Sequence, residues 1–186
     1  METLNLTNNF LIATPSLADP NFQQTVTYIC AHNAEGAMGI IINRPMTIDL
    51  GDVLTQMNLE PLTDEIRATT IYQGGPVQQD RGFIIYNPPS HWDSTINVSK
   101  QLGVATSRDI LEAISRGRGP GHVLVALGYA GWGSGQLEHE VADNAWLNCP
   151  ADAQILFEVP CEQRWQAAVR LLGIDMDQLS PDVGHA

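Results

Sequence analysis

The stretch that decides the fold is residues 122–140, which read HVLVALGYAGWGSGQLEHE. It begins with a continuous apolar run, His122 to Leu127, which predicts a strand buried on both faces. Glycines follow from residue 128, and they predict a loop. The spacing of apolar residues beyond this loop predicts a helix from about Gln136 to Leu147. A buried strand that leads through a loop into a helix indicates a sheet with helices packed against it.

Strands and helices alternate on both sides of this stretch. Strands are predicted at residues 10–13, 25–30, 38–42, 69–73, 82–86, 94–99 and 155–159. Helices are predicted at residues 48–57 with Thr47 as the cap, from the capping box at 106–109 to Gly117, and at 163–172. The strands at 25–30 and 38–42 are close enough to form a hairpin. The pattern predicts a single mixed-sheet domain over residues 1–186, of the α+β or α/β class.

Composition narrows the class of protein. The chain has 186 residues, of which 44% are hydrophobic, so a disordered or collagen-like chain is excluded. Acidic residues number 21 and basic residues 9, giving a formal net charge of -12. DNA binding normally depends on cations that neutralise phosphates, so we expect no direct nucleic-acid binding and no attraction to an anionic membrane surface.

The N-terminal sequence and the cysteines indicate in which compartment the protein is expected. The N-terminus has no basic segment, and its longest early apolar run, residues 10–13, is far too short for a signal peptide or a membrane span. The three cysteines form no CxxC motif, which favours reduced thiols. We therefore expect a soluble cytoplasmic protein.

The glycine loop at 128–136 is the first candidate site. A loop between a strand and a helix directs free backbone N–H groups and a helix N-terminus at one spot, which is how proteins bind anions. Its candidate ligand-binding residues are Gly131, Trp132, Gly133, Ser134 and Gln136. The spacing matches neither GxGxxG, the P-loop nor GxSxG, so a tight turn without a ligand remains the alternative.

Glu138 is a separate candidate, because helical geometry places it in the middle of the apolar arc of the predicted helix. A buried carboxylate needs hydrogen bonds, so we predict bonds from the N–H groups of the glycine loop or from Trp132, with a ligand contact or catalytic acid as the alternative. His139 and Glu140 fall on the solvent-facing arc, where an ordinary exposed pair is expected. The histidines lack metal-ligand spacing, and we expect no metal and no cofactor.

Two arginines lie at strand ends, where a guanidinium can bind a carboxylate or phosphate. Arg44 follows Asn43 at the end of one strand, and Arg81 opens another. Together with Gly74 and Gly75, which end a third strand, they predict a ligand site shared with the glycine loop. The alternative is that each arginine bonds nearby carbonyls or an aspartate.

Four motifs together resemble the YqgE/AlgH family of bacterial proteins over nearly the whole chain. The motifs lie at residues 10–22, 36–45, 74–77 and 128–138. The resemblance implies a cytoplasmic protein with an α+β fold, a mixed β-sheet with N-terminal hairpin strands packed by about four helices. It implies no established activity, although some members are labelled transcriptional regulators. Ala31 and Tyr86 depart from the family pattern, which usually has glutamate and often has histidine at these positions.

Two classes of function follow. The first is a regulatory or binding module that acts through a small anionic ligand or a protein partner. The second is a hydrolase that uses the glycine loop as an oxyanion or phosphate site. An enzyme needs a nucleophile or base beside its stabilising donors, and the loop offers only Ser134 and Glu138 without an evident histidine. The sequence therefore favours the binding module.

Overall fold

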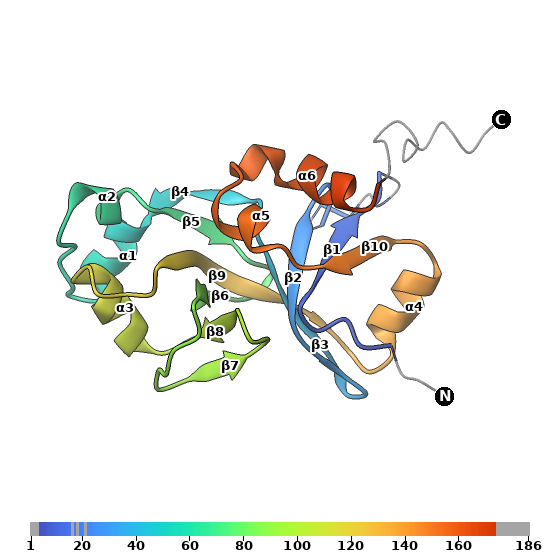
Figure 1. Cartoon of the computed structure of the whole chain (residues 1–186), viewed down its shortest axis with the longest axis horizontal. Coiled ribbons are helices and arrows are strands. Elements are labelled where there is room, and N and C mark those ends of the chain that lie inside the picture. Colours follow the sequence, from blue (N-terminus) through green and yellow to red (C-terminus); the bar gives the residue numbers. More distant parts are fainter. Residues whose placement is uncertain (1–3, 16, 18, 21, 174–186) are drawn as a thin grey trace.

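A large curled sheet forms the centre of the molecule, and helices lie at both of its ends and over one face (Figure 1). The computed structural model describes residues 4–15, 17, 19–20 and 22–173. Within these residues the strand order is β10-β1-β2-β3-β9-β6-β8-β7, and β4 pairs with β5, which pairs with β9. The β5–β9 pair is parallel and the other pairs among the described residues are antiparallel, so the predicted α+β fold with a mixed sheet is confirmed.

The elements have the following bounds. The strands are β1 (Asn9–Ala13), β2 (Val26–Asn33), β3 (Gly36–Ile41), β4 (Pro45–Asp49), β5 (Thr70–Gln73), β6 (Val77–Asn87), β7 (Thr95–Asn97), β8 (Gly103–Ala105), β9 (His122–Trp132) and β10 (Trp146–Pro150). The helices are α1 (Leu50–Gln56), α2 (Asp64–Arg67), α3 (Arg108–Ser115), α4 (Gln136–Ala142), α5 (Ala153–Phe157) and α6 (Arg164–Leu171), with a 3-10 turn at Cys161–Gln163. The described residues thus form two more α-helices than the four expected, and the N-terminal hairpin β2–β3 is as predicted.

Strand β9 is the central strand because it pairs with β3, β5 and β6. Its residues 124–126 are buried, as the apolar run predicts. The strand does not end at Leu127, however, but continues through the glycines to Trp132. Gly128 permits this, because its φ of 80° accommodates an irregularity in the pairing with β6 that a side chain would disfavour. The predicted loop from residue 128 is therefore wrong, and the loop is only residues 133–135.

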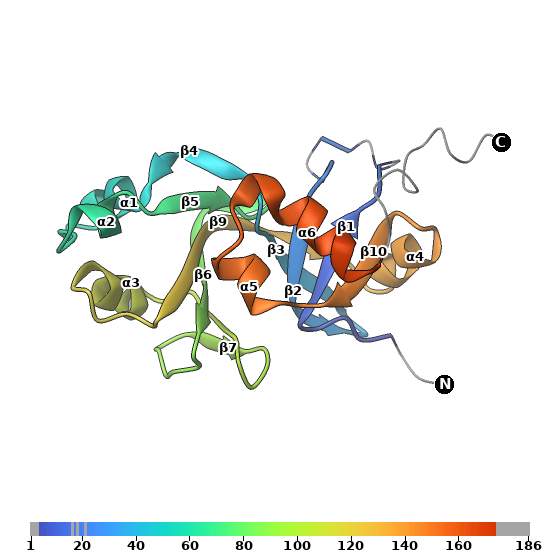
Figure 2. The same cartoon turned by 45° about the horizontal axis from the view of Figure 1, so that its top comes forward.

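The helices pack against the sheet in three separate places (Figures 1 and 2). α5 and α6 cover one core cluster, which includes Leu156 and Trp165. α1 and α3 cover a second cluster with Leu54 and Ile110, at one end of the molecule. α4 closes a third cluster at the opposite end, around Trp132. No helix in the described ranges is long and apolar enough to cross a membrane.

Helix α1 begins later than predicted. Residues 45–49 form β4, which pairs with β5, and Asp49 rather than Thr47 caps the helix. The Asp49 carboxylate accepts a hydrogen bond from the Asp52 backbone N–H at 3.0 Å, and the Asp52 carboxylate accepts one from the Asp49 N–H at 3.0 Å. This reciprocal capping box fixes the start of α1, because it satisfies two N–H groups that the first turn leaves without helical partners.

Two predictions near the C-terminus are wrong. The helix predicted to reach Leu147 ends at Ala142, because Asn144 adopts a left-handed φ of 61° and the chain then forms β10 against β1. The strand predicted at 155–159 is helix α5. The Asp152 carboxylate caps it by accepting a hydrogen bond from the Gln154 N–H at 2.8 Å. A short apolar run has no period that separates strand from helix, so this cap decides the outcome.

Candidate functional site

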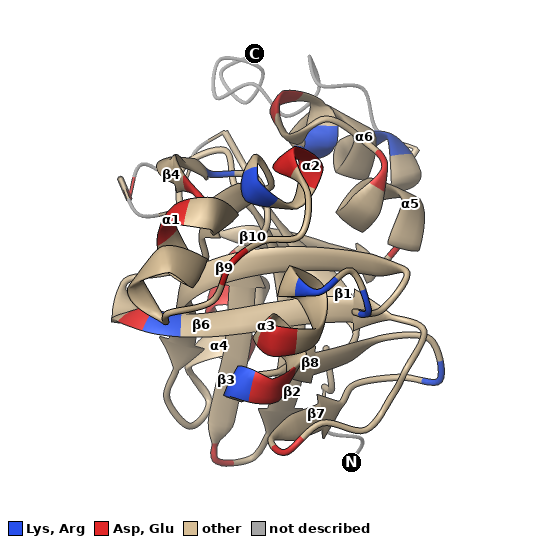
Figure 3. Cartoon of the chain, turned by 90° about the vertical axis from the view of Figure 1, so that its left-hand side faces the viewer, with Lys and Arg blue, Asp and Glu red and all other residues tan. Residues whose placement is uncertain are grey.

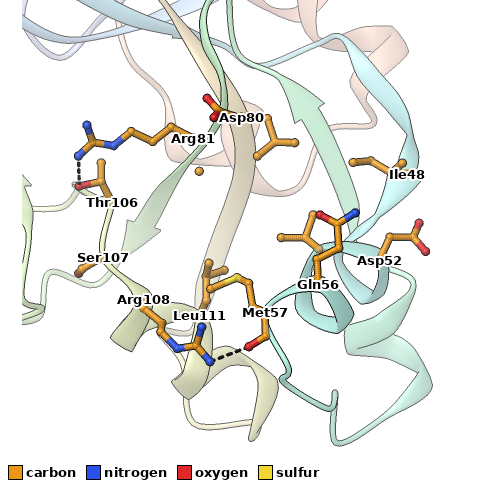
Figure 4. A pocket seen from close by; sticks show the side chains of 13 residues that line it. Ile48, Asp52, Gln56, Met57, Asp80, Arg81, Thr106, Ser107, Arg108 and Leu111 are labelled. Atoms are coloured by element: carbon orange, nitrogen blue, oxygen red, sulfur yellow. Dashed lines mark hydrogen bonds between the residues drawn. The ribbon is translucent and has the colours of Figure 1, made fainter.

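A pocket of about 470 Å³ lies between α1, α3 and the start of β6 (Figure 4). Its floor is apolar and comes from four elements and the residue that follows α1. The side chains are Ile48 of β4, Val53 of α1, Met57 beside it, Leu111 of α3 and Leu127 of β9. Leu111 is buried and the other four are only half-buried, so they present apolar surface to the pocket. Such a floor favours a ligand with an apolar body.

Two arginines stand at the edge of this pocket (Figure 4). Arg81 is exposed and donates from Nη2 to the Thr106 hydroxyl at 3.3 Å, its one hydrogen bond among the described residues. Arg108 is more engaged, because Nη2 donates to the Met57 carbonyl at 2.7 Å and Nε donates to Glu112 at 2.9 Å. Arg81 therefore keeps most of its N–H groups available, whereas Arg108 ties α3 to the end of α1.

Two carboxylates also line the pocket. Asp52 takes part in the capping box of α1, and Figure 4 shows its carboxylate on the opposite side of the pocket from the Arg81 guanidinium. Asp80 is exposed and precedes Arg81 in β6. Two negative charges near the edge oppose a dianion more than a monoanion. The lining thus holds two arginines and two carboxylates around an apolar floor.

Asn43 and Arg44 lie elsewhere, in a polar depression of about 360 Å³ with Gln23, Gln24 and Trp165. Asn43 accepts from the Val26 N–H at 2.9 Å and donates to the Gln24 carbonyl at 3.0 Å, and Arg44 donates to the Gln23 carbonyl at 3.1 Å. Partial burial lowers the pKa of Arg44, and nearby Asp19 opposes this. These bonds hold the chain before β2 against the end of β3.

Gly74 and Gly75 are close-approach positions of the backbone. A Cβ on Gly74 would overlap the Gly128 carbonyl, and one on Gly75 would overlap the peptide that joins Tyr129 to Ala130. The Ile41 N–H donates to the Gly74 carbonyl at 2.8 Å, and the Gly74 N–H donates to the Leu127 carbonyl at 2.8 Å. The glycines thus let the chain pass directly over β9, which leaves them no free surface for a ligand.

The short loop after β9 is closed by its own polar groups. The Gln136 side-chain oxygen accepts from the Gly133 N–H at 2.9 Å, and the Ser134 hydroxyl donates to the Ala34 carbonyl at 2.7 Å. Gly131 pairs with Met38 in the sheet. Neither the pocket that Arg81 lines nor the depression that Arg44 lines includes a residue of this loop.

Glu138 bonds to a residue that the helical argument did not suggest. His32 of β2 lies 2.7 Å from the Glu138 carboxylate through Nε2, and the Leu6 N–H donates to its Nδ1 at 2.9 Å. Because Nδ1 accepts, Nε2 carries the hydrogen and donates it to Glu138. The predicted bonds from the glycine loop or Trp132 are therefore wrong. The Glu138 side chain is 29% exposed, so it is partly buried, where the helical argument predicted a largely buried carboxylate.

The geometry of the His32–Glu138 pair indicates a structural role. The His32 side chain has no exposed surface and both ring nitrogens are occupied, so it cannot serve a substrate as a base. The hydrogen bond from His32 lowers the pKa of Glu138 below its usual range, with a smaller contribution from the Glu138 backbone N–H and against the effect of partial burial. The pair holds α4 and the N-terminal segment onto β2.

We expect Glu138→Gln to lower the free energy of unfolding by about 1 kcal/mol at pH 7, because a neutral amide accepts the His32 bond more weakly. The pKa of Glu138 is depressed in the folded state, so its contribution is present above the unfolded-state value and is lost as the pH falls through the folded-state value. Urea unfolding at pH 7 and pH 3 should show the difference shrinking in acid. Glu35→Gln, in the exposed β2–β3 turn, is the control. An equal loss at both pH values would contradict this.

The Glu140 carboxylate accepts three side-chain hydrogen bonds. Its Oε1 accepts from the indole N–H groups of Trp132 at 3.1 Å and Trp146 at 2.9 Å, and its Oε2 accepts from Gln136 at 2.9 Å. The two indole rings lie 6.2 Å apart, and Phe22 packs against both. The expectation that Glu140 is an ordinary exposed residue is wrong, because the carboxylate reaches back over the aromatic cluster.

The sequence predicted one residue of the large pocket, Arg81, and missed the rest. Thr106, Arg108 and Met57 come from segments whose proximity depends on the sheet. The available signal was Arg108, which lies within the predicted capping box at 106–109. That capping box is not formed, because α3 begins after Ser107, whose side chain makes no capping hydrogen bond. Within the described ranges, no group of three His, Cys, Asp or Glu side chains could hold a metal ion.

Comparisons with known proteins agree with one another. A family model described as AlgH-like matches residues 10–177. A UPF0301 protein of Thioalkalivibrio sulfidiphilus is 56% identical over 98% of this chain and 97% of its own length, and one of Thiobacillus denitrificans is 48% identical over 100% of both.

Solved structures extend the match to three dimensions. The solution structure of the AlgH protein from Pseudomonas aeruginosa has a TM-score of 0.81 and 48% identity, covering 96% of this chain and 95% of that one. The crystal structure of protein DIP2367 from Corynebacterium diphtheriae has a TM-score of 0.75 at 18% identity, covering 97% and 94%, and shows the fold alone. With a family model over most of its length and relatives near half identity, this chain belongs to the AlgH-like family.

Proposed function

We propose that this protein is a cytoplasmic binding module for a small amphipathic monoanion, which binds in the pocket between α1 and α3. The observation that carries the proposal is the position of Arg81, an arginine with unused donors beside an apolar floor. An arginine fork is suited to a carboxylate, and the floor is suited to a ring or branched chain. No chemistry on the ligand is implied.

The apolar floor and Arg81 contribute differently to binding. Each Å² of apolar ligand surface removed from water contributes about 25 cal/mol to the binding free energy. The floor of the pocket therefore supplies most of the affinity. Arg81 is exposed, so its charge contributes less to affinity than to orientation and selection of an anion. In a chain with nine basic residues and a net charge of -12, two of the nine line this pocket beside two carboxylates, so the lining does not share the strong negative charge of the whole chain.

The probe for this proposal is 2-naphthoate, a carboxylate on a flat apolar ring system. We expect saturable binding by the intact protein, measured by isothermal titration calorimetry at 150 mM salt. Arg81→Met should weaken binding about tenfold, because it removes the guanidinium and keeps an apolar side chain of similar length.

Two controls make this result specific. Arg118→Met removes an exposed charge outside the pocket and should leave the affinity unchanged. The neutral analogue 2-naphthamide should bind the parent protein about as weakly as 2-naphthoate binds the Arg81→Met variant. Binding that is equal in the parent and in Arg81→Met would overturn the role of Arg81.

The hydrolase alternative gains no support from the glycine loop. Ser134 donates to a backbone carbonyl, and among the described residues no histidine is hydrogen-bonded to it. The Gly133 N–H is bonded to Gln136, so it is not free to stabilise an oxyanion. The binding module is therefore the function that the geometry favours.

We propose further that duplex DNA is not a direct ligand. Figure 3 shows acidic and basic residues mixed over the face that carries α1 and α3, with no continuous basic stripe. A net charge of -12 opposes phosphate contacts. We expect no binding above a weak background in a fluorescence anisotropy titration at 150 mM salt. A dissociation constant tighter than about 10⁻⁷ M for one sequence would contradict this.

A further inference from the structure

Unpaired charges of both signs line the pocket of Arg81, and the negative ones are in excess. Arg108 is already paired with Glu112, whose carboxylate lies 2.9 Å from its Nε. Arg81, Asp52 and Asp80 are exposed, and none of the three forms an ion pair with another described residue. One guanidinium and two carboxylates therefore face the same pocket without partners. A ligand that carries a cation as well as a carboxylate would match this arrangement better than a simple anion.

An irregularity in β6 brings Asp80 and Arg81 to the same pocket. In a regular strand, neighbouring side chains point to opposite faces of the sheet. Residues 78–81 leave the regular pairing with β9, because all four lie opposite Gly128 alone. Both Asp80 and Arg81 line the pocket as a result. Such local departures from strand geometry are common next to active sites, where they redirect side chains.

Asp52 lies across the pocket from Arg81 (Figure 4). Its Oδ2 accepts from the Asp49 N–H, and among the described residues its Oδ1 has no hydrogen-bond donor. The Asp49 carboxylate accepts from the Asp52 N–H at 3.0 Å and adds a second negative charge on this side. Met57 and Leu111 of the apolar floor lie between the two sides in this view. The pocket thus has a cationic side and an anionic side, with apolar surface between them.

We infer that the pocket binds an apolar dipeptide with free termini. This inference rests on the proposed function for the carboxylate end of the ligand, which binds Arg81, and it adds an ammonium group at the other end, beside Asp52. The two apolar side chains of the dipeptide would cover the floor. Its peptide group would exchange hydrogen bonds with the side-chain amide of Gln56, which is exposed, lines the pocket and can both donate and accept.

The test compares three ligands of nearly equal size by isothermal titration calorimetry of the intact protein at pH 6.5 and 150 mM salt. Leucyl-leucine is a zwitterion at this pH, 4-methylpentanoyl-leucine is the same molecule without the amino group, and leucyl-leucinamide is a monocation. We expect leucyl-leucine to bind about threefold tighter than the des-amino analogue, because an exposed ion pair contributes modestly. It should bind about tenfold tighter than the amide, which lacks the carboxylate for Arg81.

Two variants assign the preference for the amino group to one side chain. Asp52→Asn should abolish the difference between leucyl-leucine and its des-amino analogue. Asparagine keeps an oxygen that accepts from the Asp49 N–H, so the start of α1 is retained. Glu65→Gln removes an exposed carboxylate of α2 outside the pocket, and it should leave the threefold difference unchanged.

Two results would each overturn the inference. The first is leucyl-leucine that does not bind, or that binds no tighter than its des-amino analogue. The second is a preference for leucyl-leucine that persists in Asp52→Asn. The proposed function fails separately, namely when the binding of 2-naphthoate does not depend on Arg81. With Arg81-dependent binding of 2-naphthoate, either of the two results would refute only the ammonium end of the ligand.

Discussion

Replacing Gly75 with alanine is expected to lower the free energy of unfolding by about 3 kcal/mol or more. The added methyl group would occupy the space of the peptide between Tyr129 and Ala130. These are backbone atoms of the central strand, so they cannot move aside as the end of a flexible side chain can. The chain after β5 would have to separate from β9, which would also disrupt the hydrogen bond of Gly74 to Leu127.

The measurement is urea unfolding followed by circular dichroism, with Gly82→Ala as the matched control. Gly82 lies in β6, its φ is not left-handed, and a methyl group there would meet no atom within 4 Å. The control should differ from the parent by no more than about 0.5 kcal/mol. If Gly75→Ala were as stable as the parent, the close approach would be disproved, and a ligand-binding role for this glycine would be open again.

Replacing Glu140 with alanine should lower the free energy of unfolding by about 2–4 kcal/mol. Trp132 is 6% exposed and Trp146 is 2% exposed, so loss of the carboxylate leaves two buried indole N–H groups without an acceptor. Each buried donor left unpaired costs about 1–3 kcal/mol. Tryptophan fluorescence should also change, because the shared carboxylate orients both rings.

Two further variants show whether the loss of stability comes from the hydrogen bonds that Glu140 accepts or from the removal of any carboxylate in this region. Glu140→Gln retains an acceptor oxygen and should lose only about 1–2 kcal/mol. Asp143→Ala removes an exposed carboxylate of the same helical region, paired with His139 at 3.1 Å, and should change stability by less than about 0.5 kcal/mol. If Glu140→Ala and Asp143→Ala gave equal losses, the carboxylate would not be holding the aromatic cluster.

Elements with a strong local signal were predictable from the sequence. β2 and β3 follow from β-branched and apolar runs on either side of a turn, and α6 follows from its amphipathic spacing and from Gly173, whose φ is 70°. β4 and β10 were missed because their pairing depends on distant segments. β10 pairs with β1, far away in the sequence, and Trp146 continues the apolar arc of the predicted helix.

The candidate sites were likewise only partly predictable from the sequence. Arg81 was predicted because it was expected to open a strand. β6 begins earlier, at Val77, and Arg81 lies within it on the edge of the large pocket. The floor of that pocket comes from β4, α1, α3 and β9 and has no local signature. The angular argument placed Glu138 toward the core but did not identify His32, 106 positions earlier, as its partner. Geometry within one helix gives the direction of a side chain, and only the sheet topology gives its partner.

The most direct test of the proposed binding site is a set of intermolecular nuclear Overhauser effects between 2-naphthoate and the methyl-labelled protein. The proposal predicts contacts from the naphthalene ring to the methyl groups of Ile48, Met57, Leu111 and Leu127, which form the floor of the pocket. Contacts confined to methyl groups outside this pocket, or no contacts at saturating 2-naphthoate, would contradict it.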